Sequence, residues 1–131
     1  MANMRFINPP NIHAPRGYTH VVEATGPGRI VYIAGQLGAD PAGKMAGDFR
    51  AQAVQAFENL KIALAAVGGK FEQVVKVNMY FTDIDGQLPI AREVRDRYVN
   101  TAAAPASTAV QISKLARDGA LFEIEAVALL P

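Results

Sequence analysis

DFRAQAVQAFENLKIALAAVGGKFEQVVKVNMYFTD, residues 48–83, predicts an amphipathic helix followed at once by a half-buried strand. Asp48 is the predicted N-cap, and Gly68 and Gly69 end the helix because glycine tolerates the left-handed conformation found after a helix. Residues 73–83 alternate apolar and polar side chains, as in a strand with one buried face. The apolar helix residues recur at spacings of three and four: Phe49, Ala53, Ala56, Phe57, Leu60, Ala63, Leu64 and Val67.

The sequence before this stretch predicts two strands between irregular segments. Residues 1–17 hold three prolines and are expected to form an irregular N-terminal arm. Residues 18–24 and 29–35 are strand-like, and TGPG (25–28) between them has the glycine and proline of a hairpin loop. Residues 36–47 are rich in Gly, Pro and Asp, which predicts a loop.

After residue 83 the sequence predicts a second helix and two final strands, 106–112 and 121–130. Pro89 is placed near the first turn of the helix, where a missing N–H is tolerated. The apolar stripe of this helix is Leu88, Ala91, Val94 and Tyr98. The resulting order, ββαβαββ, predicts an α+β fold in which strands come in hairpins and two helices cover one face of a mostly antiparallel or mixed sheet.

Two helices on one face leave the other face of the sheet uncovered. Tyr32, Val127 and Leu129 are large apolar residues of the predicted strands that are available for that face. A bare apolar face on a sheet generally marks association. We therefore expect a homo-oligomer.

Length, composition and charge limit the class of protein. A chain of 131 residues, half of them hydrophobic, fits a single domain, 1–131, with a substantial core. The net charge of +1 does not favour nucleic acid or an acidic membrane surface as a partner. The lack of cysteine excludes disulfides, thiol catalysis and thiolate metal sites. No secretory signal and no apolar run near the roughly 20 residues of a membrane helix is present, so a cytoplasmic protein is expected.

The histidines and Ser107 carry no complete catalytic or metal-binding motif. His13 and His20 have no cysteine partner and no carboxylate at ligand spacing, so no metal site is predicted. His20 is either a general base or a surface or pocket-wall residue. Ser107 has no base beside it in the sequence, and a nucleophilic serine needs a positioned base, which disfavours a serine nucleophile.

Charged residues offer two further candidates. Glu123 and Glu125 are two apart in a strand and share a face, which must meet water, a partner subunit or a pocket because carboxylates on an apolar face are costly. Each is either a general base with a raised pKa or part of an exposed, ion-paired strand edge. REVRDR (92–97) predicts a solvated helical face. Arg92 lies nearer the apolar stripe than the later arginines, and is either solvated or a contact to a ligand carboxylate.

Taken together, these segments resemble the RidA/YjgF family, also called endoribonuclease L-PSP. The resemblance covers roughly residues 18–129 and rests on GYTHVVEA, VYIAGQLGADPAGKMAGDFRAQAVQAFENLKIALAAVGG, VVKVNMYFTDID, AREVRDRYV, APASTAVQI and FEIEAVAL. It implies a chorismate-mutase-like subunit and a homotrimer whose sheets form a central barrel, with clefts between neighbouring subunits. The best-known members hydrolyse imines and enamines derived from amino acids to a 2-oxo acid and ammonia, without a metal or organic cofactor.

The resemblance also implies roles for matching residues. Glu123 matches the glutamate that positions the attacking water, which makes it the candidate catalytic residue. Tyr18 matches the pocket tyrosine, and Gly35 matches the backbone that lines the pocket. Arg92 falls where the family often has a pocket asparagine and is a candidate replacement cation.

The sequence departs from the family at three pocket positions. Ser107, in PAST, stands where active relatives have the arginine that grips the substrate carboxylate. Ala109 replaces a serine or cysteine, and Ala34 replaces the serine before the pocket glycine. A hydrogen bond to a charged group contributes on the order of 1.5–3 kcal/mol, so hydrolysis of small imino acids is expected to fall without the clamp.

The sequence therefore predicts a cofactor-free imine or enamine deaminase with altered substrate choice, working in an intersubunit cleft. The alternative is a binding protein that holds a small metabolite unchanged; loss of the arginine favours it and retention of Glu123 disfavours it. Ribonuclease activity or translation inhibition is disfavoured by the near-neutral charge and by the lack of a histidine pair for acid–base work.

Overall fold

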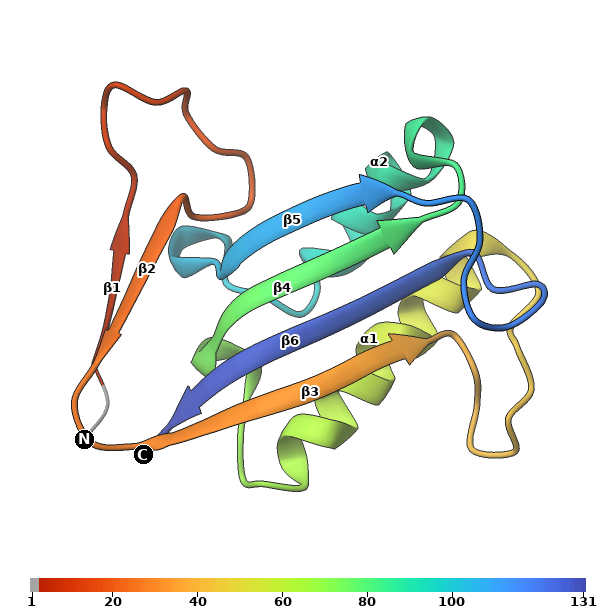
Figure 1. Cartoon of the computed structure of the whole chain (residues 1–131), viewed down its shortest axis with the longest axis horizontal. Coiled ribbons are helices and arrows are strands. Elements are labelled where there is room, and N and C mark those ends of the chain that lie inside the picture. Colours follow the sequence, from red (N-terminus) through yellow and green to blue (C-terminus); the bar gives the residue numbers. More distant parts are fainter. Residues whose placement is uncertain (1–2) are drawn as a thin grey trace.

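A four-stranded sheet with both helices packed on one face dominates the structure, a computed structural model that describes residues 3–131 (Figure 1). The strand order is β3–β6–β4–β5, with β6 antiparallel to both neighbours and β5 parallel to β4. The α+β prediction, with a mixed sheet and helices on one side, is confirmed. The elements are β3 (Arg29–Leu37), α1 (Phe49–Ala65), β4 (Val74–Phe81), α2 (Ile84–Arg95), β5 (Ala106–Gln111) and β6 (Phe122–Leu130), with short 3-10 turns at Phe71–Gln73 and Thr101–Ala103.

Local signals fix both ends of α1. The carboxylate of Asp48 accepts a hydrogen bond from the backbone N–H of Ala51 at 2.8 Å, which satisfies one of the free donors of the first turn. Beyond the other end, Gly68 has a φ of +76°, and the N–H of Gly69 returns to the carbonyl of Leu64 at 2.8 Å. The predicted cap and the predicted stop are both confirmed.

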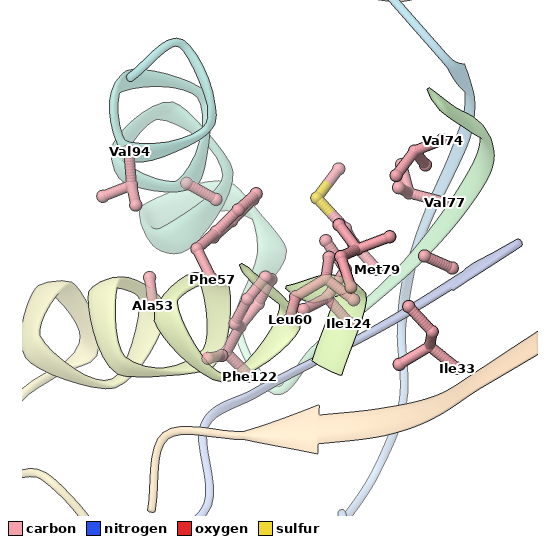
Figure 2. Close-up of a cluster of buried hydrophobic side chains, with 14 of the residues drawn as sticks. Ile33, Ala53, Phe57, Leu60, Val74, Val77, Met79, Val94, Phe122 and Ile124 are labelled. Atoms are coloured by element: carbon pink, nitrogen blue, oxygen red, sulfur yellow. The ribbon is translucent and has the colours of Figure 1, made fainter. Parts of the chain in front are cut away.

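The core lies between α1, α2 and the helix-facing side of the sheet (Figure 2). Every second residue of β6 from Phe122 to Leu130 is buried, while the residues between them point to the other face. The rings of Phe57 and Phe122 stack with centroids 6.1 Å apart, which joins α1 to the central strand. The predicted buried face of α1 packs here, as do Val77, Met79 and Phe81 of β4. The alternation also assigned Val75 to the buried face, which is wrong: the register of β4 shifts between Val74 and Lys76, and Val75 lies with Tyr32 and Val127 on the other face.

Gln52 is a polar side chain inside this core, with 1% of its surface exposed. Its amide nitrogen donates to the carbonyls of Ala46 and Gly119 at 3.0 and 2.9 Å, and its amide oxygen accepts from the N–H of Leu121 at 2.8 Å. The loop before α1 and the loop before β6 are therefore both fastened to the helix.

The prediction of an irregular arm is wrong for residues 3–7, although residues 8–17 are irregular as expected. The predicted hairpin between 18–24 and 29–35 is also wrong. Residues 3–7 form a strand, β1 (Asn3–Ile7), which pairs with β2 (Val21–Thr25) in a separate two-stranded sheet. Residues 1–2 of the arm lie outside the described residues. The pairing is supported by an ion pair between Arg5 and Glu23 at 2.8 Å. β2 therefore pairs with a strand that precedes it in the chain, and not with β3. β1 and β2 stand apart from the main sheet in Figure 1.

The expected hairpin of the last two strands is also wrong, because β4 lies between β5 and β6. α2 carries the chain back along the sheet between β4 and β5, so these two strands run parallel. α2 begins at Ile84, which puts Pro89 well inside the helix instead of near its first turn. Tyr98 follows the C-terminal end of α2 at Arg95.

The sheet face away from the helices is uncovered, as predicted. Tyr32 is 78% exposed and Ile30 is 61% exposed, and they lie opposite Val127 and Leu129 on β6. Among residues 3–131, no helix is both long enough and apolar enough to cross a membrane.

Candidate functional site

A cavity of about 290 Å³ lies beside β5 on the helix side of the sheet. It brings together four residues singled out from the sequence, Tyr18, Arg92, Ser107 and Ala109. Arg16, Met79, Leu88 and Arg95 complete its lining. We call this space the β5 cavity.

Tyr18 reaches the β5 cavity because the segment before β2 is tied to the start of β5, near which the loop between β1 and β2 runs in Figure 1. The N–H of Thr19 donates to the carbonyl of Pro105 at 3.2 Å, and its hydroxyl donates to the carbonyl of Ala104. Thr19 itself is 4% exposed. The turn that precedes Ser107 is thereby fastened to the residue beside Tyr18.

Both histidines stand beside Tyr18 and outside the lining of the β5 cavity. The Nε2 atom of His13 lies 2.9 Å from the Tyr18 hydroxyl, and the Nε2 atom of His20 lies 2.7 Å from the carbonyl oxygen of His13. A carbonyl only accepts, so His20 carries its hydrogen on Nε2 and donates it. His20 thus orders the segment that presents Tyr18.

α2 supplies two of the three arginines that line the β5 cavity. Arg92 is exposed, whereas Arg95 is only 7% exposed and is paired with Asp96 at 2.9 Å. The expectation that Arg95 belongs to a solvated helical face is wrong, because it lies one turn after buried Ala91 on the same side of the helix. Gly17, with a φ of +73°, lets the backbone before Tyr18 lie directly on the Arg95 guanidinium, since a Cβ there would overlap it.

Sequence reasoning did not identify Arg16 or Arg95 as cavity residues. The spacing of Arg95 from Ala91 is the signal that was available for it. Arg16 offers no comparable signal, because it lies in an irregular segment whose path depends on contacts with the start of β5.

A second cluster forms on the uncovered face, where β6 meets β3. The register of β3 shifts between Ile33 and Gln36, which places Ala34 and Gly35 in a bulge. The carboxylate of Glu123 lies against Gly35 so closely that a Cβ there would overlap it. Glycine at position 35 is therefore what lets the backbone of β3 meet this carboxylate.

Glu123 has an environment that favours the protonated form. Burial, followed by the negative charge of Glu125, raises the pKa of Glu123 above its ordinary value. Glu125 accepts a hydrogen bond from the hydroxyl of Tyr80 at 2.5 Å, and this bond is the main cause of the raised pKa of Tyr80. Because the carboxylate of Glu125 is bonded to Tyr80, Glu123 is the glutamate of this pair whose carboxylate is available to act on a ligand.

Comparisons with known proteins agree with this architecture. The family model described as Endoribonuclease L-PSP matches residues 11–130. The chain belongs to the Endoribonuclease L-PSP family. A RutC family protein of Aquifex aeolicus is 34% identical over 128 residues, covering 96% of this chain and 99% of the relative.

Two further proteins are similar to this L-PSP family member over most of its length. The 2-iminobutanoate/2-iminopropanoate deaminase of Salmonella typhimurium is 30% identical over 119 residues, covering 89% of this chain and 92% of the enzyme. The crystal structure of YyfB from Yersinia pestis, of the conserved Rid protein family, superposes with a TM-score of 0.85 at 31% identity and covers 98% of this chain and 99% of that one. The resemblance found in the sequence is confirmed at the level of family and fold.

In this L-PSP family member, the two clusters do not meet within one chain. Ser107 is in register with Val77, whose side chain packs toward the helices, whereas Glu123 is in register with Tyr80 on the uncovered face. β5 and β3 are opposite edges of the sheet, three strand spacings or roughly 14 Å apart. The site residues therefore form two separate groups, Tyr18, Arg92, Ser107 and Ala109 in one and Ala34, Gly35 and Glu123 in the other.

Proposed function

We propose that this chain is a cofactor-free imine or enamine deaminase whose site is completed between two copies. The observation that carries the proposal is the placement of Glu123 over the Gly35 bulge, on the face and edge opposite to the β5 cavity. Each chain would then contribute a carboxylate to one cleft and a cationic cavity to another. The name of the Salmonella relative, a 2-iminobutanoate/2-iminopropanoate deaminase, supports the choice of reaction.

The reaction needs one base and one anchor. Glu123 takes a proton from water as the water oxygen bonds to the C=N carbon, and the nitrogen gains a proton. Glu123 then takes the hydroxyl proton of the resulting carbinolamine and passes it to the nitrogen; the C–N bond breaks, and ammonia and a carbonyl compound are released. The raised pKa of Glu123 suits this role, because a base with a pKa nearer to neutral accepts a proton more readily than an ordinary glutamate. Tyr18 and the cavity arginines hold the carboxylate of the substrate.

The β5 cavity also supports an altered substrate choice. Ser107 and Ala109 are small and uncharged, so the β5 strand supplies no cation to the ligand. Arg92 supplies it from α2 instead. An anchor on another wall of the cavity changes both the position and the orientation of the bound carboxylate.

We propose a homotrimer as the assembly that closes these clefts. Tyr32 and Ile30 expose most of their side chains on the sheet face that no helix covers, and such a face gains stability when a second copy buries it. Light scattering is expected to give wild type the mass of three 14.0 kDa chains, and Tyr32→Lys the mass of one. A wild-type monomer with full activity would contradict the shared cleft.

The activity is tested by following ammonia release and imine decay on imines generated freshly by an amino acid oxidase. Glu123→Gln is expected to lower the rate about 100-fold or more, within the range that general-base catalysis contributes. Glu72→Gln is the matched control, since Glu72 lies on the turn before β4, outside both clusters. No acceleration of imine decay by wild type on any amino acid imine refutes the deaminase. Binding of a metabolite that is recovered unchanged would then identify the protein as a non-catalytic binder.

A further inference from the structure

The β5 cavity contains more positive charge than one carboxylate needs. Arg16, Arg92 and Arg95 all line it, and the other five lining residues include no aspartate or glutamate. Three guanidinium groups thus share about 290 Å³. At roughly 30 Å³ per water molecule in the liquid, this volume corresponds to about ten waters, so it suits a small ligand.

Two of these arginines lack a carboxylate. The guanidinium of Arg95 is occupied by Asp96, through contacts of 2.9 and 3.0 Å. Arg16 and Arg92 form no ion pair with any residue in the described part of the chain. Each offers five N–H donors and no acceptor, and both side chains are exposed, so each guanidinium is available to an anion brought by a ligand.

The two free guanidinium groups come from different walls. Arg92 projects from α2, whereas Arg16 belongs to the segment between β1 and β2. The backbone beside Arg16 is held in place, because Gly17 lies on the buried Arg95 and Thr19 is bonded to the start of β5. Two anchors on two walls match two separate anionic groups better than one.

We propose that the β5 cavity binds a small dicarboxylate, with one carboxylate on Arg92 and the other on Arg16. For the reaction this rests on the proposed function, and the substrate class is then the imine of an acidic amino acid. One carboxylate adjoins the C=N carbon that Glu123 of a second copy serves, and the other holds the far end of the molecule. Ser107 leaves the space in which the chain between them lies.

Binding is tested by calorimetry at fixed ionic strength with succinate, propionate and inorganic phosphate on the full-length protein. Succinate is expected to bind at least about tenfold more tightly than propionate, because it makes a second charge-assisted pair. Arg16→Ala and Arg92→Ala are each expected to remove most of that preference. Equal affinity for succinate and propionate, or no binding of succinate, overturns the proposal. Tighter binding of phosphate than of succinate also overturns it, in favour of a phosphoryl group.

Arg97→Ala is the matched control. Arg97 lies two residues after Arg95 but lines a different cavity, of about 620 Å³, with residues of α1 and the turn before β4. Its loss changes the net charge by the same amount and is expected to leave the preference for succinate unchanged. A loss equal to that of Arg92→Ala would mean that overall charge, and not the cavity, selects the ligand, which overturns the proposal.

Measurements of imine hydrolysis distinguish a failure of the dicarboxylate proposal from a failure of the proposed deaminase function. Wild type is expected to hydrolyse the imines of aspartate and glutamate at least about tenfold more efficiently than the imine of alanine. Equal efficiency would leave the deaminase standing and overturn the dicarboxylate preference. Arginine-dependent binding of succinate without hydrolysis of any imine would leave the dicarboxylate site standing and overturn the deaminase.

Discussion

Replacement of Gln52 by leucine tests how the loops around the sheet are held. The two side chains are similar in size, but leucine removes three hydrogen bonds, to the carbonyls of Ala46 and Gly119 and from the N–H of Leu121. Each bond contributes about 1 kcal/mol net, and each backbone group left buried without a partner adds to the loss. We expect Gln52→Leu to lower the free energy of unfolding by roughly 3 kcal/mol, with a fall in Tm of roughly 10 °C.

Urea unfolding measures this loss, with wild type and variant at the same protein concentration because association adds to apparent stability. Gln55→Leu is the control on the same helix. Among residues 3–131, the amide of Gln55 donates to the side chain of Asn59 alone, at 2.9 Å, so a loss below about 1 kcal/mol is expected. If Gln52→Leu costs less than about 1 kcal/mol, or no more than Gln55→Leu, the amide does not fasten the two loops to α1.

Three further changes test the site and its surroundings. Gly17→Ala forces a Cβ into the Arg95 guanidinium at a φ of +73°, which displaces the wall of the β5 cavity. Calorimetry is expected to show succinate binding weakened about tenfold or more. Unchanged affinity would mean that the segment relaxes without moving the cavity wall. Glu125→Gln removes a charge that raises the pKa of Glu123, so the acid limb of the imine-hydrolysis profile is expected to move to lower pH, and a limb that stays in place contradicts the coupling. Burial and the carboxylate of Glu58 on α1 raise the pKa of Tyr98 to about 12. The folded chain therefore keeps a proton that the unfolded chain loses above about pH 10. Wild-type stability is therefore expected to fall between pH 10 and 12; urea midpoints at pH 8 and 11 should show a smaller fall for Tyr98→Phe, and parallel declines would refute this.

The sequence predicted best the elements whose signals are local. α1 has its cap, its apolar period and its glycine stop within residues 48–69, and all three act on neighbouring backbone groups. The alternation in β4 likewise depends only on the period of a strand with one buried face. Neither prediction depends on a distant partner, which is why α1 and the alternation from Val77 to Phe81 were predicted correctly.

Strand pairing was predicted less well, because it is decided by distant segments. TGPG looks like a hairpin loop, yet β2 pairs with β1 and β3 pairs with β6. β5 was expected to pair with β6, although a strand–helix–strand order over residues 74–111 favours a parallel pair with β4. The first error reflects a competing partner in the N-terminal segment, and the second reflects information that the element order already contained.

The candidate site residues were likewise predicted where the signal is local and missed where it depends on distant contacts. Tyr18, Ser107 and Glu123 were found through motifs that surround them in the sequence. Arg16 was missed because its position depends on how the segment before β2 meets the start of β5. Arg95 was assigned to solvent because a run of charged residues was weighed above its spacing from Ala91.

Ser107 has a different meaning once the cavity around it is known. Judged by sequence alone, serine at this position removes the cation of the pocket. In the folded chain, arginines at 16, 92 and 95 surround the same serine, so the cavity is cationic although β5 is neutral. An arginine at position 107 would crowd these groups, since a fourth guanidinium would share the same small volume with no carboxylate to offset it. Under the proposed binding mode, the small side chain of Ser107 is therefore a condition for a two-anion ligand, because it leaves room for the ligand between Arg16 and Arg92.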